Sequence, residues 1–195
     1  FMAHVIKDGT GAGYNAKVSV DNHLAVNAVS VEEVTHISSL DERAYHFHLE
    51  RTLVAANTEE NVGIITYTGD NKLQIWGISV SKEDVALDSG AQAVFEVVSG
   101  AAYTSGGDAV TPINLNLGSP NQPDNVTYSG TTTLVLDTSS EAEIFDVATE
   151  HPFTIEFRGS LILTKGDSVA IKGKSKNIGD KLHVLVTAFE VTEAI

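Results

Sequence analysis

The chain has 195 residues, 42% of them hydrophobic, and its 26 acidic and 12 basic residues give a formal net charge of −14. This length fits one main domain with an appended arm, because β-sandwiches of roughly 200 residues often form a single unit. The acidity disfavours binding to nucleic acid and to anionic membranes. The sequence contains no cysteine, which excludes disulfides and thiol chemistry.

The sequence shows no pattern typical of membrane insertion or secretion. No apolar run approaches the roughly 18 residues of a transmembrane helix. The start of the chain lacks the charged, apolar and small-residue regions of a signal peptide. Phe1 precedes Met2, so we interpret Met2 as the native start. Synthesis in the cytoplasm is expected, which the absence of cysteine fits.

Residues 1–40 are expected to form an extended, glycine-containing arm. Gly9, Gly11 and Gly13 disfavour regular structure near the start. Apolar and polar residues then alternate over residues 16–20 and 24–31, on either side of an Asp21-Asn22 turn signal. This pattern predicts either a hairpin or an extended arm laid across a partner. Polar residues 32–43 form the junction.

Residues 41–195 are expected to form an all-β, jelly-roll-like sandwich. Short strands separated by turn signals are typical of such folds. Gly69-Asp70-Asn71 is interpreted as a hairpin turn, and two further tight turns are expected at 165–167 and 179–180. The predicted strands cover residues 44–50, 62–68, 72–80, 92–99, 132–136, 153–158, 160–163, 168–171 and 182–191.

Two segments depart from this pattern. Residues 100–131 are rich in Gly, Ser, Thr, Asn and Pro, and predict a long surface excursion with one short strand near residues 110–116. Ser140 and Glu143 have the spacing of a capping box, which predicts a two-turn helix over residues 140–147. The acidic residues at 137–150 are interpreted as a solvated helix face, with calcium binding as the alternative.

His46, His48 and Glu50 are the candidate metal ligands of the sequence. Alternate residues of a strand share a face, and imidazole is a common metal ligand. The spacing resembles the start of the metal site in cupins. However, Thr52 stands where cupins have a glutamate, and no Pro-x-Gly turn precedes the distant His183. Partly exposed strand histidines are therefore the preferred interpretation, with metal binding as the alternative.

Other motifs give no catalytic or nucleotide site. The glycines at 9, 11 and 13 do not follow a strand and do not open a helix, as a dinucleotide-binding loop requires. No Gly-x-Ser-x-Gly elbow occurs in the chain. We therefore expect a protein that is not an enzyme and needs no cofactor.

Several segments, in this order, resemble virion proteins of tailed bacteriophages. They are Ile-Lys-Asp-Gly-Thr-Gly-Ala-Gly-Tyr-Asn-Ala-Lys-Val at 6–18, Asn-His-Leu-Ala-Val at 22–26, Ser-Gly-Gly-Asp-Ala-Val-Thr-Pro-Ile-Asn-Leu-Asn at 105–116, Leu-Ile-Leu-x-x-Gly-Asp-Ser-Val-Ala-Ile at 161–171, and the final strand at 184–191. The acidic stretch at 137–150 departs from this resemblance.

The resemblance implies a capsid decoration (cement) or head-fibre type of protein on the outer capsid surface, without catalytic residues. It implies a homotrimer whose partners are the major capsid protein or other virion proteins. The arm would then dock through Lys7, Asp8, Gly9, Gly11, Gly13 and Tyr14. Two alternatives stay open. One is a tail, fibre or receptor-binding module with Trp76, Tyr103 and Tyr128 as sugar contacts, and the other is a cupin-like metal-binding protein.

Overall fold

The computed structural model describes residues 17–18, 24–25, 43–85 and 92–191. The chain divides into two units, residues 1–34 and 35–195. In the first unit, β1 (Lys17–Val18) pairs antiparallel with β2 (Leu24–Ala25). Of the two predictions for this segment, the pairing agrees with the hairpin. The boundary expected between residues 40 and 41 lies outside the described residues.

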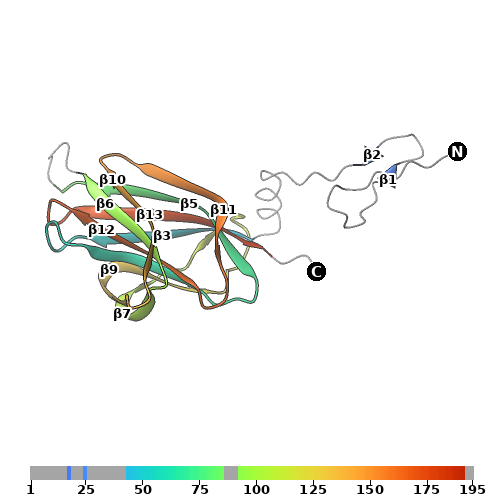
Figure 1. The fold of residues 1–195 in the computed structure, drawn as a ribbon, viewed down its shortest axis with the longest axis horizontal. Helices are drawn as coiled ribbons and strands as arrows, with labels where there is room; N and C mark the ends of the chain where they lie inside the picture. The colour runs from blue at the N-terminus through green and yellow to red at the C-terminus, as the bar shows by residue number, and fades with distance from the viewer. Residues whose placement is uncertain (1–16, 19–23, 26–42, 86–91, 192–195) are drawn as a thin grey trace. The chain divides into compact units, whose positions relative to one another are not determined.

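The second unit is a sandwich of two antiparallel sheets, so the prediction of an all-β sandwich is confirmed (Figure 1). The six-stranded sheet has the order β10 (Ala142–Thr149), β6 (Ala93–Ser99), β12 (Ser168–Ser175), β4 (Glu60–Tyr67), β9 (Asn125–Asp137) and β7 (Ala102–Ala109). The five-stranded sheet has the order β11 (Phe153–Leu163), β5 (Lys72–Glu83), β13 (Lys181–Val191), β3 (Ala44–Thr52) and β8 (Ile113–Asn114).

The strands pair in a nested order along the chain. β3 pairs with β13, β4 with β12, β5 with β11, β6 with β10, and β7 with β9. The strands from β3 to β13 therefore resemble one long antiparallel hairpin that has been rolled up, with β8 in the connection near its tip. Each of these pairs joins an early strand to a late one, so the sandwich is held together by contacts between residues far apart in the sequence.

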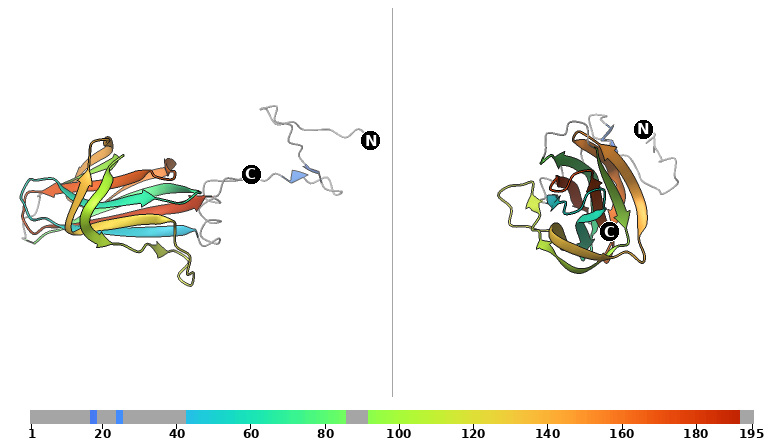
Figure 2. Two further views of the ribbon diagram at one scale, coloured as in Figure 1. Left: turned by 90° about the horizontal axis from the view of Figure 1, so that it is seen from below. Right: turned by 90° about the vertical axis from the view of Figure 1, so that its left-hand side faces the viewer.

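A single apolar core fills the space between the sheets. Along β3, Tyr45, Phe47 and Leu49 are at most 1% exposed, whereas the residues between them reach the outer face. Strand geometry explains this alternation, because successive side chains point to opposite faces of a sheet. Phe95 of β6 meets this cluster from the other sheet. The end-on view in Figure 2 shows the strands curving around this core.

A second, smaller cluster covers the outer face of the six-stranded sheet. Ile64, Val98 and Ala170 lie side by side on β4, β6 and β12, and are packed with Ala101 and Leu134. This cluster explains why β4 at residues 62–65 and β12 at residues 169–171 are apolar and buried on both faces.

A buried ion pair ties the two sheets together. Arg51 of β3 donates from Nε to Glu60 Oε2 of β4 over 2.6 Å, and from Nη1 to the Gly130 carbonyl of β9 over 2.9 Å. Glu60 Oε1 accepts the backbone N–H groups of Val54 and Ala55 at 2.8 and 3.0 Å. Both charged groups are thus hydrogen-bonded, which buried charges require.

Two local predictions were wrong. Gly69-Asp70-Asn71 does not close a hairpin, because it connects β4 and β5, which belong to different sheets. Residues 142–149 form β10 in place of the predicted helix. As a strand, this segment pairs with β6 and packs Ile144, Phe145 and Val147 against the core. An isolated two-turn helix would lack comparable packing, and capping alone contributes too little.

The segment at 100–131 is more ordered than its composition indicates. β7, β8 and the first half of β9 all fall within it. β8 is the short strand predicted near residues 110–116, whereas β7 and β9 are sheet strands where a surface excursion was expected. Gly106 and Gly107 take φ values of 74° and 69°, at irregularities in the pairing of β7 with β9. Glycine is the residue for which such φ values carry no steric penalty. At these two positions glycine therefore serves irregular strand pairing, which composition does not distinguish from a loop.

In the part of the chain that the structure describes, there is no helix with the length and apolar character needed to cross a membrane.

Candidate functional site

The outer face of the five-stranded sheet carries the candidate ligands. His46, His48 and Glu50 alternate with the buried core residues of β3 and therefore project outward together. His48 is exposed, whereas His46 and Glu50 are half-buried. Burial lowers the pKa of His46, because desolvation disfavours the imidazolium form.

The neighbouring strand β13 completes the group with His183. The register places His183 opposite Glu50 and Leu185 opposite His48, so His183 lies diagonally beside His48. The two imidazole rings stack, with centroids 5.8 Å apart and planes inclined by 17°. Among the described residues, His48, Glu50 and His183 each offer a ligand atom within 4.8 Å of the other two. His46 is not a member of this group, although the sequence placed it among the candidates.

Ion pairs orient the group. Lys181 Nζ lies 2.9 Å from Glu50 Oε2, and this hydrogen bond is the main reason that the pKa of Glu50 is lowered. His183 Nδ1 lies 3.8 Å from the same oxygen. On the other side of the ring, His183 Nε2 lies 3.4 Å from Glu83 Oε2 of β5. His183 therefore sits between two carboxylates, one at each ring nitrogen.

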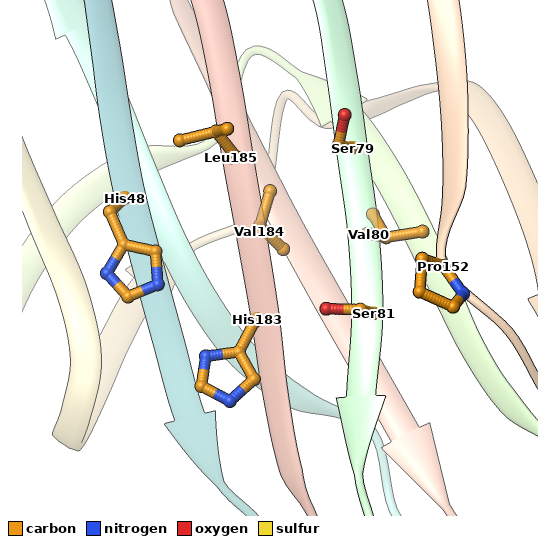
Figure 3. A pocket seen from close by; sticks show the side chains of 8 residues that line it. All are labelled: His48, Ser79, Val80, Ser81, Pro152, His183, Val184 and Leu185. Carbon is orange, nitrogen blue, oxygen red and sulfur yellow. The ribbon is translucent and has the colours of Figure 1, made fainter.

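The two histidines open onto a pocket of about 290 Å³ (Figure 3). Ser79 and Ser81 of β5 line it beside His48 and His183, and Pro152 borders it from the turn before β11. The pocket lies on the outer face of the sheet, and the core is on the opposite face. The arrangement is suited to binding a small polar ligand or an ion at the surface.

The docking residues and the acidic stretch at 137–150 are the other candidates predicted from the sequence. The docking residues Lys7, Asp8, Gly9, Gly11, Gly13 and Tyr14 lie outside the described residues. The acidic stretch is a strand with a connecting turn, and not a helix face. Its Glu141 forms an ion pair with the largely buried Lys172 of β12.

The three aromatic candidates do not form one platform. Tyr103 of β7 and Tyr128 of β9 stack with ring centroids 3.8 Å apart and an interplanar angle of 7°. Trp76 belongs to β5 of the other sheet. Its ring and that of Phe189 form a T-shaped pair with ring centroids 5.8 Å apart. Of the three candidates, Tyr103 and Tyr128 therefore lie together, and Trp76 lies apart from them.

His183 belongs to this group although it was not among the residues predicted from the sequence. Its spacing from His48 is long, and the missing Pro-x-Gly turn argued against a cupin-type partner. The alternation of β13 puts His183 on an outward-facing position. However, the sequence gives neither the adjacency of β13 and β3 nor their register, and both are needed to bring His183 opposite Glu50.

Comparisons with known proteins give no relative: the chain matches no family model, no curated protein and no solved structure.

Proposed function

We propose that the chain is a structural protein of a bacteriophage virion, a capsid decoration protein that binds the outer capsid surface and stabilises it. The single observation that carries this proposal is the nested strand order of the sandwich. We assign this order to a jelly-roll-like fold, because a jelly roll is an antiparallel hairpin rolled into two sheets. Viral capsid domains often use this architecture. Fold alone does not determine function. The resemblance of segments at 6–18, 105–116 and 161–171 to phage virion proteins supplies the second support.

The edges of the five-stranded sheet support a homotrimer. On the edge strand β11, Phe153 and Ile162 are 41% and 42% exposed. At the other edge, Ile113 of β8 and the nearby Leu117 are 55% and 86% exposed. Exposed apolar edge strands favour unwanted pairing unless something covers them. In a cyclic trimer, one edge of each subunit would meet the opposite edge of the next, because such interfaces are heterologous.

Within this proposal, the arm at residues 1–40 docks on the major capsid protein through Lys7, Asp8, Tyr14 and the glycines between them. A glycine-rich segment can follow a partner surface closely, because it lacks side chains at those positions. The net charge of −14 supports a position on the outside of the particle, away from the packaged nucleic acid.

The first experiment measures assembly and capsid binding. Analytical ultracentrifugation of the full chain should give a trimer, and the protein should sediment with capsids that lack it. Ile162→Asp and Leu117→Asp should shift the protein toward the monomer. Val54→Asp is the matched control, because Val54 is 66% exposed in the turn between β3 and β4, away from both sheet edges.

Deletion of residues 1–16 tests the docking role separately. The truncated chain should keep the near-ultraviolet signal of the folded sandwich and lose capsid binding. A full-length chain that stays monomeric and never sediments with capsids would overturn the proposal.

A receptor-binding or tail-fibre role is the second candidate function, and the stacked pair Tyr103–Tyr128 favours it. Aromatic faces at a surface are suited to packing against apolar ligand faces, including those of sugars. Tyr103 is 38% exposed. If this role is correct, Tyr103→Ala should reduce adsorption to host cells, whereas Trp76→Ala in the other sheet should not. Unchanged adsorption of Tyr103→Ala would remove its support.

A further inference from the structure

We infer that His48, Glu50 and His183 form a binding site for Zn²⁺ on the outer face of the five-stranded sheet. The inference rests on the geometry of β3 and β13 and is independent of the proposed role in a virion.

The spacing of the three side chains fits a zinc ion. Zinc binds imidazole nitrogen and carboxylate oxygen at about 2.0–2.2 Å, so neighbouring ligand atoms of a tetrahedral site are about 3.4 Å apart. His183 Nδ1 and Glu50 Oε2 are already 3.8 Å apart. All three ligand atoms lie within 4.8 Å of one another. The exposed ring of His48 can close the remaining gap by rotating about its side-chain bonds.

The surroundings of His183 prepare one ring nitrogen for a metal. A carboxylate can only accept a hydrogen bond, and Glu83 Oε2 is nearer to Nε2 (3.4 Å) than Glu50 Oε2 is to Nδ1 (3.8 Å), so we assign the N–H of the neutral ring to Nε2. Nδ1, which faces Glu50, is then left with a free lone pair. Metal-binding histidines generally donate their other N–H to a carboxylate or carbonyl in this way, which fixes the tautomer. Glu83 is therefore a positioning residue for the site.

Lys181 opposes metal binding without blocking it. Its Nζ lies 2.9 Å from Glu50 Oε2, where it would repel a nearby cation. The lysine side chain is 34% exposed and can withdraw into solvent. A variant that lacks the Lys181 charge should therefore bind zinc more tightly than the wild-type chain.

The ligand set favours zinc over calcium and magnesium. Two imidazoles and one carboxylate suit a borderline-soft ion, whereas calcium and magnesium prefer sites built from oxygen alone. Three protein ligands leave the fourth position of a tetrahedral site for another group. The pocket beside them is lined by both histidines together with Ser79 and Ser81 (Figure 3). In the isolated protein we assign this position to water.

Isothermal titration calorimetry of the full chain with zinc chloride tests the inference. The wild-type chain should show a saturable site with one ion per chain. His183→Gln and His48→Ala should each weaken that site more than about tenfold, since lesser changes around metal ligands already cost about 10–100-fold. Lys181→Met should tighten it severalfold. Calcium chloride and magnesium chloride should give no saturable binding at these residues.

His46→Ala and His151→Ala serve as matched controls. His46 shares the face of β3 with His48 but lies outside the ligand group, and His151 is exposed in the turn between β10 and β11. Both variants should keep the zinc site, and every variant should keep the near-ultraviolet circular dichroism of Trp76. The inference is overturned if the wild-type chain does not bind zinc, or if His48→Ala and His183→Gln bind it like wild type while folded.

Discussion

The buried ion pair between Arg51 and Glu60 provides the sharpest test of how the two sheets are held together. Arg51→Met removes the guanidinium and keeps an unbranched apolar side chain of similar reach. Glu60, whose side chain is 9% exposed, then stays behind as a buried carboxylate. The Gly130 carbonyl also loses the Arg51 Nη1 donor. The variant should therefore be destabilised mainly by an uncompensated charge.

The structure sets the size of the effect. Removing one partner of a buried ion pair costs about 3–5 kcal/mol. Two backbone N–H groups still hold Glu60 Oε1 after the substitution, which favours the lower half of this range, about 3–4 kcal/mol. With a urea m-value of about 2 kcal/mol/M, the unfolding midpoint should fall by about 1.5–2 M.

Urea denaturation followed by Trp76 fluorescence measures the midpoint. Arg51→Met/Glu60→Gln removes both charges and should recover at least about 1 kcal/mol relative to Arg51→Met. Arg158→Met is the control, because Arg158 and its partner Glu156 are exposed, and the change should stay within about 0.5 kcal/mol. If Arg51→Met is no less stable than this control, or if the double variant shows no recovery, the reasoning about the buried charge is refuted.

Three further predictions concern packing and pH. Gly130→Ala should lower the free energy of unfolding in urea by about 1–3 kcal/mol, because the added Cβ would overlap the Asn61 carbonyl oxygen. Phe95→Ala should cost about 3–5 kcal/mol by leaving a cavity in the core, measured in the same assay. Glu50→Gln should flatten the acid side of the stability–pH curve. The lowered pKa of Glu50 makes its carboxylate stabilising above the unfolded value of about 4.3, and this stability is lost as pH falls through the lower folded value.

Each of these predictions has a control and a contradicting result. Gly118→Ala should be near neutral, because its Cβ would meet only Asn116 Oδ1 at 3.9 Å, so equal losses at both glycines would contradict the steric argument. Phe153→Ala at an exposed position should cost far less than Phe95→Ala, and a similar cost would contradict the placement of the core. Parallel pH curves for wild type and Glu50→Gln would show that the Lys181 hydrogen bond does not stabilise the fold.

Local patterns in the sequence predicted most of the strands, because period-two alternation is a property of each strand by itself. The strands at 72–80, 92–99 and 182–191 fall within β5, β6 and β13 apart from one residue, Gln92, before β6. The same reasoning failed where local and tertiary preferences conflict. Residues 140–147 carry a capping box, yet their apolar side chains find partners only as the edge strand β10.

The candidate site was also predictable in part from local pattern and in part only from the tertiary structure. The spacing of His46, His48 and Glu50 was sufficient to place them on one face of β3, since alternate residues of a strand point the same way. The sequence did not decide which of them would meet another ligand. That choice depended on the pairing of β3 with β13, which joins Glu50 to His183 across 133 positions of the chain. Register is set by the packing of the buried faces on the core, and only the tertiary structure determines it.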